Sequence, residues 1–270
     1  MKLKKVLFAA VVLALVAAFG ISGYMVLDYM MEGKKQAEKY DELSEIVANA
    51  QTTPDATAGE TDPGETLDRT VDIKDENGML LCYKDIYEMN NDTVGWLKME
   101  GTEIDYPVMQ TPDEINYYLY RDFQGEESDR GCIYAWEAAD VNEPSDNITL
   151  FGHNMRDGSM FAALNAYTKK EAWEKNSLIF FDTLSEFHTY KIFAVFRTTA
   201  TQGKGFSYHK FVDAKDEADF DKFVKQCKEL AYYDTGITPT YGDKLLLLST
   251  CEYTHPDQNG RLVVAAYRIT

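Results

Sequence analysis

Near the C-terminus, residues 245–252 read LLLLSTCE. The four leucines predict a buried strand, and Cys251 stands at its end. Another apolar run opens at Arg261, and a third, residues 148–151, leads directly into His153. A thiol, a guanidinium and an imidazole therefore stand at the ends of predicted strands, where a sheet commonly builds its active site.

The C-terminal two thirds of the chain reads as a succession of short strands. Apolar or alternating runs predict strands at residues 95–99, 104–109, 131–136, 147–152, 177–182, 188–197, 244–250 and 261–269. About eight strands with few helices between them favour a mainly β fold, a barrel or a sandwich, over a doubly wound sheet. A short helix is predicted at residues 79–89. Residues 216–231 place apolar side chains near one face, which predicts an amphipathic helix packed on the barrel.

The N-terminus predicts a membrane anchor. Residues 6–27 form an uncharged stretch of 22 residues that follows Lys2, Lys4 and Lys5. At about 1.5 Å per residue a helix of this length spans roughly 33 Å, which is enough for a hydrocarbon core of about 30 Å. The lysines predict that residues 1–5 are cytoplasmic and that the rest is extracellular after a single pass. Small residues late in the stretch leave a cleaved signal peptide as the alternative, but its length favours an uncleaved anchor.

Residues 28–74 connect this anchor to the predicted domain. Residues 32–50 are rich in Lys, Glu, Gln and Ala, which predicts a juxtamembrane helix. Residues 51–68 are rich in Thr, Pro, Asp, Gly and Glu, a composition that cannot bury enough apolar surface to offset the entropy of ordering. We therefore expect a flexible stalk there and an extracellular folded domain at residues 75–270.

Composition bears on partners and on metals. The chain has 45 acidic and 27 basic side chains, a formal net charge of -18, which argues against a nucleic-acid partner because phosphates require basic contacts. The cysteines show no C-x-x-C spacing and the acidic residues no recognisable cluster, so neither a metal site nor a cofactor is predicted. Cys82, Cys132 and Cys227 are predicted to be buried apolar side chains, although an exported protein could pair cysteines as disulfides.

The three strand-end residues suit acyl transfer. Cys251 needs a nearby base or cation, because only a thiolate attacks carbonyls and the free thiol has a pKa of about 8.5. Of the four histidines, His153 is the best placed as a base. Arg261 lies 10 residues beyond Cys251, a hairpin away, where its charge could bind a carbonyl oxygen that becomes an oxyanion.

These residues stand in motifs that resemble those of a known family. The His, Cys and Arg motifs of sortases, the cysteine transpeptidases of Gram-positive surfaces, resemble LFGHNM at residues 150–155, LSTCE at 248–252 and GRLVV at 260–264. The class B branch in particular is similar at residues 95–97, 104–110, 118–119 and 216–236. The resemblance covers residues 79–270. It implies a closed sortase-type β-barrel of about eight strands with short helices, one long helix preceding the strand of Cys251.

The resemblance implies that Cys251 attacks the carbonyl of a Thr-containing C-terminal sorting signal and forms a thioacyl enzyme. His153 would be the general acid for the leaving amine and then the base for the incoming one, while Arg261 would hold the substrate carbonyl. The backbone N–H of Glu252 would complete the oxyanion site. The implied partners are secreted proteins that carry the motif and, as acceptor, a peptidoglycan precursor or another cell-wall amine.

Substrate contacts are expected from side chains that flank the catalytic motifs or precede the long helix, namely Leu119, Phe151, Tyr208, Ser249 and Glu252. The chain departs from the class pattern after residues 131–134, where an acidic residue is commonly expected and Ala135 and Trp136 stand instead. Its loop at residues 252–259 carries Tyr253 and His255. These departures bear on the substrate motif and on the shape of the loop.

Three other functions stay open. An exported cysteine peptidase would use the same thiol for hydrolysis, and an anchored scaffold would leave Cys251 inert or disulfide-paired. A pilin-polymerising sortase resembles a fold with an N-terminal lid and often a C-terminal membrane segment. No lid is evident, and the chain ends at Thr270 directly after the last predicted strand, so anchoring to the cell wall is the favoured expectation.

Overall fold

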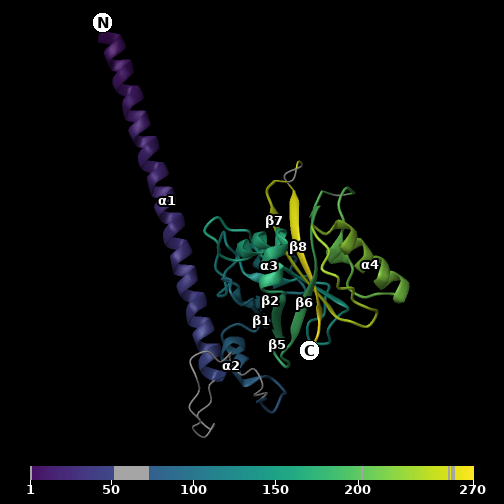
Figure 1. Ribbon diagram of the computed structural model, residues 1–270. Helices are drawn as coiled ribbons and strands as arrows, with labels where there is room; N and C mark the ends of the chain where they lie inside the picture. Colours follow the sequence, from purple (N-terminus) through teal and green to yellow (C-terminus); the bar gives the residue numbers. More distant parts are fainter. Residues whose placement is uncertain (1, 52–72, 202, 255, 257–258) are drawn as a thin grey trace. The chain divides into compact units, whose positions relative to one another are not determined.

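The computed structural model describes residues 2–51, 73–201, 203–254, 256 and 259–270 (Figure 1). The chain divides into two compact units, Met1–Glu42 and Leu43–Thr270. Helix α1 (Lys2–Gln51) supplies the first unit and continues into the second. An 18-residue window of α1 has a mean hydropathy of 2.5 and no buried residue, so the helix is long and apolar enough to cross a membrane.

The predicted anchor and the predicted juxtamembrane helix are parts of this one helix. Gln51, which the composition assigned to the stalk, is its last residue, and residues 52–68 of the predicted stalk lie outside the described part of the chain. Within the second unit, Ser44 near the end of α1 donates a hydrogen bond of 3.2 Å to Asp105. The same carboxylate accepts from Trp96 Nε1 at 2.6 Å, so Asp105 joins the end of α1 to the sheet.

The described residues of the second unit form eight strands: β1 (Thr93–Lys98), β2 (Asp105–Met109), β3 (Ile133–Ala135), β4 (Asn147–Phe151), β5 (Leu178–Thr183), β6 (Thr189–Thr199), β7 (Leu245–Glu252) and β8 (Gly260–Arg268). They pair in the order β1-β2-β3-β4-β7-β8-β6-β5, and β5 pairs with β1, so the mixed sheet is a ring. The pairs β2·β3 and β4·β7 are parallel and the other pairs are antiparallel. The expected count of about eight strands is confirmed, each close to its predicted bounds.

Helices precede or connect the strands of the ring, and their bounds are α2 (Leu81–Met89), η1 (Tyr117–Tyr120), η2 (Ala162–Thr168), α3 (Lys170–Lys175), η3 (Tyr208–Lys210) and α4 (Glu217–Leu230). The predicted helices at residues 79–89 and 216–231 correspond to α2 and α4. Helix α4 begins where the Asp216 carboxylate accepts a hydrogen bond of 2.9 Å from the Asp219 N–H, an N-cap that satisfies one of the free donors of the first turn.

Strand β7 is buried on both faces, which explains its run of leucines. Leu245 and Leu247 belong to a core cluster that also contains Phe220 and Phe223 of α4, so α4 covers one face of the strand. Leu246 points to the opposite face because side chains alternate along a strand, and it is also fully buried, inside the ring. By the same alternation, the side chains of Ser249 and Cys251 lie on the α4 face.

Candidate active site

Cys251 and Arg261 face each other across two antiparallel strands. They are register partners in the β7·β8 pair, so their side chains project from the same face of the sheet. Both line a cavity of about 460 Å³. The Cys251 thiol is free and partly exposed. The two side chains are therefore neighbours on one face of the sheet.

His153 reaches the same cavity from the parallel neighbour of β7. Phe151 at the end of β4 is the register partner of Ser249. One residue further, the Thr250 hydroxyl donates a hydrogen bond of 2.7 Å to the Gly152 carbonyl, which continues the alignment and brings His153 level with Cys251. Gly152 allows a close approach here, because a Cβ would lie 2.5 Å from Ile133 Cδ1 and 2.8 Å from Cδ2 of the Phe161 ring.

The orientation of the His153 ring is set by a backbone carbonyl. Its Nε2 lies 2.8 Å from the Leu119 oxygen. Because a carbonyl only accepts, Nε2 carries the proton, and Nδ1 is left to exchange one. The exposed Tyr120 ring lies 5.6 Å from the imidazole, centroid to centroid. The tautomer is thus fixed by η1, which carries Leu119 and Tyr120.

Asn154 ties the histidine segment to the cysteine strand, a link that sequence reasoning missed. Its side-chain amide donates a hydrogen bond of 2.8 Å to the Cys251 carbonyl. The Tyr253 hydroxyl donates to the Asn154 carbonyl at 3.2 Å. The only sequence signal was the position of Asn154 directly after His153 in the motif.

The cavity is lined by the three catalytic candidates and by four of the five predicted substrate residues. These four are Leu119, Phe151, Tyr208 and Ser249. The Tyr208 and Ser249 hydroxyls lie 2.6 Å apart and are buried. Burial raises the pKa of Tyr208 to about 12, so this phenol is neutral. Glu252 points to the opposite face, where its carboxylate accepts from the Thr254 N–H at 2.9 Å. Only its backbone can therefore serve the cavity.

Trp136 and His209 were not predicted as site residues, yet both line the cavity. Their rings meet edge to face with centroids 4.8 Å apart, and the Trp136 ring lies 5.9 Å from that of Phe151. Burial, together with the positive charges of Lys210 and Arg261, lowers the pKa of His209. Trp136, in the segment where an acidic residue is commonly expected, is thus part of an aromatic wall.

All four cysteines lie in the described part of the chain. Cys82, Cys132 and Cys227 are buried, as predicted, and Cys251 is a free thiol. A free, partly exposed Cys251 does not fit the scaffold alternative, which required an inert or disulfide-paired residue. Among the described residues, no group of three or more His, Cys, Asp or Glu side chains could hold a metal ion.

Known proteins resemble this chain in sequence and in fold. A family model described as the Sortase domain matches residues 97–269. Sortase B of Listeria monocytogenes is 28% identical over 271 residues, covering 100% of both chains. A crystal structure of sortase B from Bacillus anthracis in complex with AAEK1 matches with a TM-score of 0.70 and 27% identity, covering 89% of this chain and 99% of that one. A Staphylococcus aureus sortase B-substrate complex has the same fold, with a TM-score of 0.71, 24% identity and the same coverage.

The family model spans more than half of the chain, and the likeness to sortase B extends over its whole length. The chain therefore belongs to the sortase family of cysteine transpeptidases, in its sortase B branch.

Proposed function

We propose that this sortase is a membrane-anchored enzyme that cleaves a Thr-containing C-terminal sorting signal and joins the protein to an amine of the cell wall. The observation that carries this proposal is the cross-strand pair of Cys251 and Arg261 in one cavity, with His153 level with the thiol. A nucleophile, a proton carrier and a cation at one cavity are the parts that acyl transfer requires.

In the first half of the reaction, the Cys251 thiolate attacks the carbonyl carbon of the signal's Thr. The tetrahedral intermediate collapses as the C–N bond breaks, and the leaving amine takes a proton from the His153 imidazolium. The product is a thioester between Cys251 and the Thr carbonyl. Nδ1 is the nitrogen suited to this transfer, since Nε2 is engaged by the Leu119 carbonyl.

In the second half, an acceptor amine attacks the thioester. His153, now neutral, takes the proton that the amine loses, and the thiolate of Cys251 leaves as the new amide bond forms. One imidazole thus serves as acid and then as base. Water in place of the amine would give hydrolysis, which is the exported-peptidase alternative.

Arg261 is proposed to bind the carbonyl oxygen of the substrate. Its side chain is directly opposite Cys251, so negative charge that develops on the substrate oxygen is close to a permanent positive charge. The backbone N–H of Glu252 follows the nucleophile and is proposed as the second donor of the oxyanion site.

The walls of the cavity favour an extended peptide with apolar residues beside the Thr. Phe151 and Trp136 present aromatic surface, and the buried Tyr208 and Ser249 hydroxyls hydrogen-bond to each other in the wall. The Staphylococcus aureus relative has been solved as a substrate complex, which supports a peptide in the corresponding cavity here. A sorting-signal peptide is therefore the proposed donor.

The proposed localisation follows from α1. Lys2, Lys4 and Lys5 precede the apolar stretch, which supports a cytoplasmic N-terminus and an extracellular catalytic domain. Secreted proteins emerge on that side of the membrane, and cell-wall amines are present there.

The experiment is a ligation assay with the full-length enzyme in detergent. Fluorescent Thr-containing peptides are incubated with and without a diaminopimelate- or glycine-bearing amine. We expect a ligated product that requires the amine and disappears in Cys251→Ala. Cleavage to free acid at the same rate with or without the amine would replace the proposal with a peptidase.

A further inference from the structure

The chain turns back on itself directly after His153. The backbone of Asn154 forms an isolated bridge with Met160, and the Phe161 N–H donates a hydrogen bond of 2.9 Å to the His153 carbonyl. Met160 is buried and has a left-handed backbone (φ 56°), which a non-glycine residue adopts only where its surroundings hold it. The backbone of His153 is therefore fixed by the return of residues 153–161.

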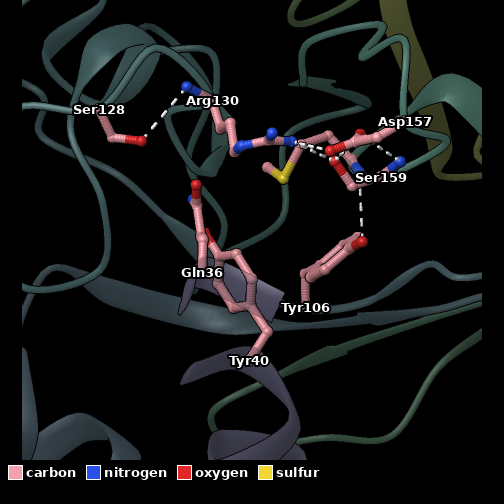
Figure 2. A network of polar contacts seen from close by, with 8 residues as sticks. Gln36, Tyr40, Tyr106, Ser128, Arg130, Asp157 and Ser159 are labelled. Atoms are coloured by element: carbon pink, nitrogen blue, oxygen red, sulfur yellow. Dashed lines mark hydrogen bonds and ion pairs between the residues drawn. The ribbon is translucent and has the colours of Figure 1, made fainter. Parts of the chain in front are cut away.

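A buried arginine from a distant segment holds the tip of this return. The Arg130 guanidinium forms an ion pair with Asp157, and the same nitrogen donates to the Ser159 hydroxyl at 3.1 Å (Figure 2). Only 5% of the Arg130 side chain is exposed. On the other side, the Tyr106 hydroxyl accepts a hydrogen bond of 3.2 Å from the Met160 N–H (Figure 2).

The ion pair is charged at neutral pH. Partial burial opposes the charge of Asp157, but hydrogen bonds from Ser159 and the adjacent Arg130 outweigh it and hold the pKa of that carboxyl below its usual range. The arginine of this pair is buried, whereas 36% of the Asp157 side chain is exposed. The ion pair joins two segments 27 residues apart in the sequence.

Gly131, the residue after Arg130, packs against the Leu119 carbonyl that orients the His153 ring. Gly131 has a φ of 55°, and a Cβ there would lie 2.4 Å from the Leu119 oxygen. That oxygen is the one that accepts from His153 Nε2. Through Asp157, Arg130 contacts the loop that fixes the backbone of His153. Its neighbour Gly131 packs against the Leu119 carbonyl, which orients the His153 ring.

We propose that Arg130 is a positioning residue for the transpeptidase, and that its contact with Asp157 sets the orientation of the His153 imidazole relative to Cys251. The proposal rests on the role of His153 proposed above. Arg130 touches no reacting atom, and its effect passes through the loop at residues 153–161 and through the Leu119 carbonyl. A small misplacement of a catalytic group can lower turnover by about 100-fold.

The test uses the full-length enzyme and four variants. Arg130→Met removes the charge and keeps the bulk, Arg130→Lys keeps the charge, and Asp157→Asn removes the partner. The matched control is Lys244→Met, because Lys244 forms an ion pair of 2.9 Å with Asp146 at the opposite end of the strands that carry the site.

We expect Arg130→Met to lower kcat by about 10-fold to 100-fold while KM changes less than about twofold. Arg130→Lys should recover a substantial part of the loss, since it retains the pairing charge. The control should lower the melting temperature and leave kcat within about twofold. The pH dependence of Cys251 alkylation should shift in Arg130→Met and not in Lys244→Met, because a merely structural contact would not change how His153 acts on the thiol.

If Arg130→Met does not fold, Asp157→Asn tests the positioning role of Arg130, because Asn has nearly the same shape as Asp and keeps the loop intact. NMR titration of the labelled His153 ring then reports its environment without turnover. An Asp157→Asn enzyme with wild-type kcat and an unchanged His153 titration would overturn the proposal. If the wild-type enzyme forms no ligated product but the His153 titration shifts in Asp157→Asn, the proposed function fails and the positioning role stands.

Discussion

Cys251 and Arg261 owe their proximity to the register of β7 and β8. Residues directly opposite in an antiparallel pair share a face, and a slip of one residue would move one of the two to the other face. The next pair along, Glu252 with Gly260, marks the end of the ladder. Cys251 and Arg261 thus lie next to the end of the paired strands, where both side chains line the cavity.

Arg261→Lys tests what the guanidinium contributes at this position. Lysine retains the charge but loses the planar set of donors, so stabilisation of the oxyanion should fall. We expect kcat/KM in the ligation assay to drop by about 100-fold, comparable to the loss of one oxyanion-hole donor. The melting temperature should stay the same. A variant with near wild-type kcat/KM would show that charge alone suffices.

His209 predicts a pH dependence of stability. Burial first, and then Lys210 and Arg261, lower its pKa in the folded protein, so the unfolded chain takes up the proton first as the pH falls through about 6.5. The free energy of unfolding should therefore decrease between about pH 7 and pH 5.5. In His209→Gln this decrease should be smaller, as measured by chemical denaturation at each pH. An equal decrease in both proteins would exclude His209 as its source.

At the scale of elements, β7 connects the core to the site. Its first half is packed between α4 and the interior of the ring, and its second half carries Ser249 and Cys251 to the cavity. β4 lies parallel to it and ends at Phe151, so the two strands deliver His153 and Cys251 at the same edge. The position of the thiol consequently depends on the packing beneath it.

Leu247→Ala measures that packing. The side chain is fully buried beneath α4, and its truncation leaves a cavity, so we expect a loss of about 2–5 kcal/mol in the free energy of unfolding. Leu230→Ala is the control, because Leu230 lies in α4 with 41% of its surface exposed and should change stability by under about 1 kcal/mol. Equal losses in chemical denaturation would contradict the assigned packing.

Over the whole molecule, strands and helices with a regular sequence pattern could be predicted from the sequence, whereas contacts between distant segments could not. The strands are apolar runs and α4 has a helical period, so both were predictable from sequence. The short helices η1 and α3 have too few residues for a period. Trp136 and His209 meet only because two distant loops converge, and the Leu119 contact with His153 uses a backbone carbonyl that has no sequence signature.

Intact-mass spectrometry of the full-length enzyme, incubated with Thr-containing peptides in the absence of an amine, detects the acyl enzyme itself. The prediction is an adduct on Cys251 with the mass of the peptide fragment that ends in Thr. The adduct should be absent in Cys251→Ala, and it should disappear as ligated product forms when an amine is added. Peptide cleavage or ligation that persists in Cys251→Ala would contradict the central claim that this cysteine carries the acyl group.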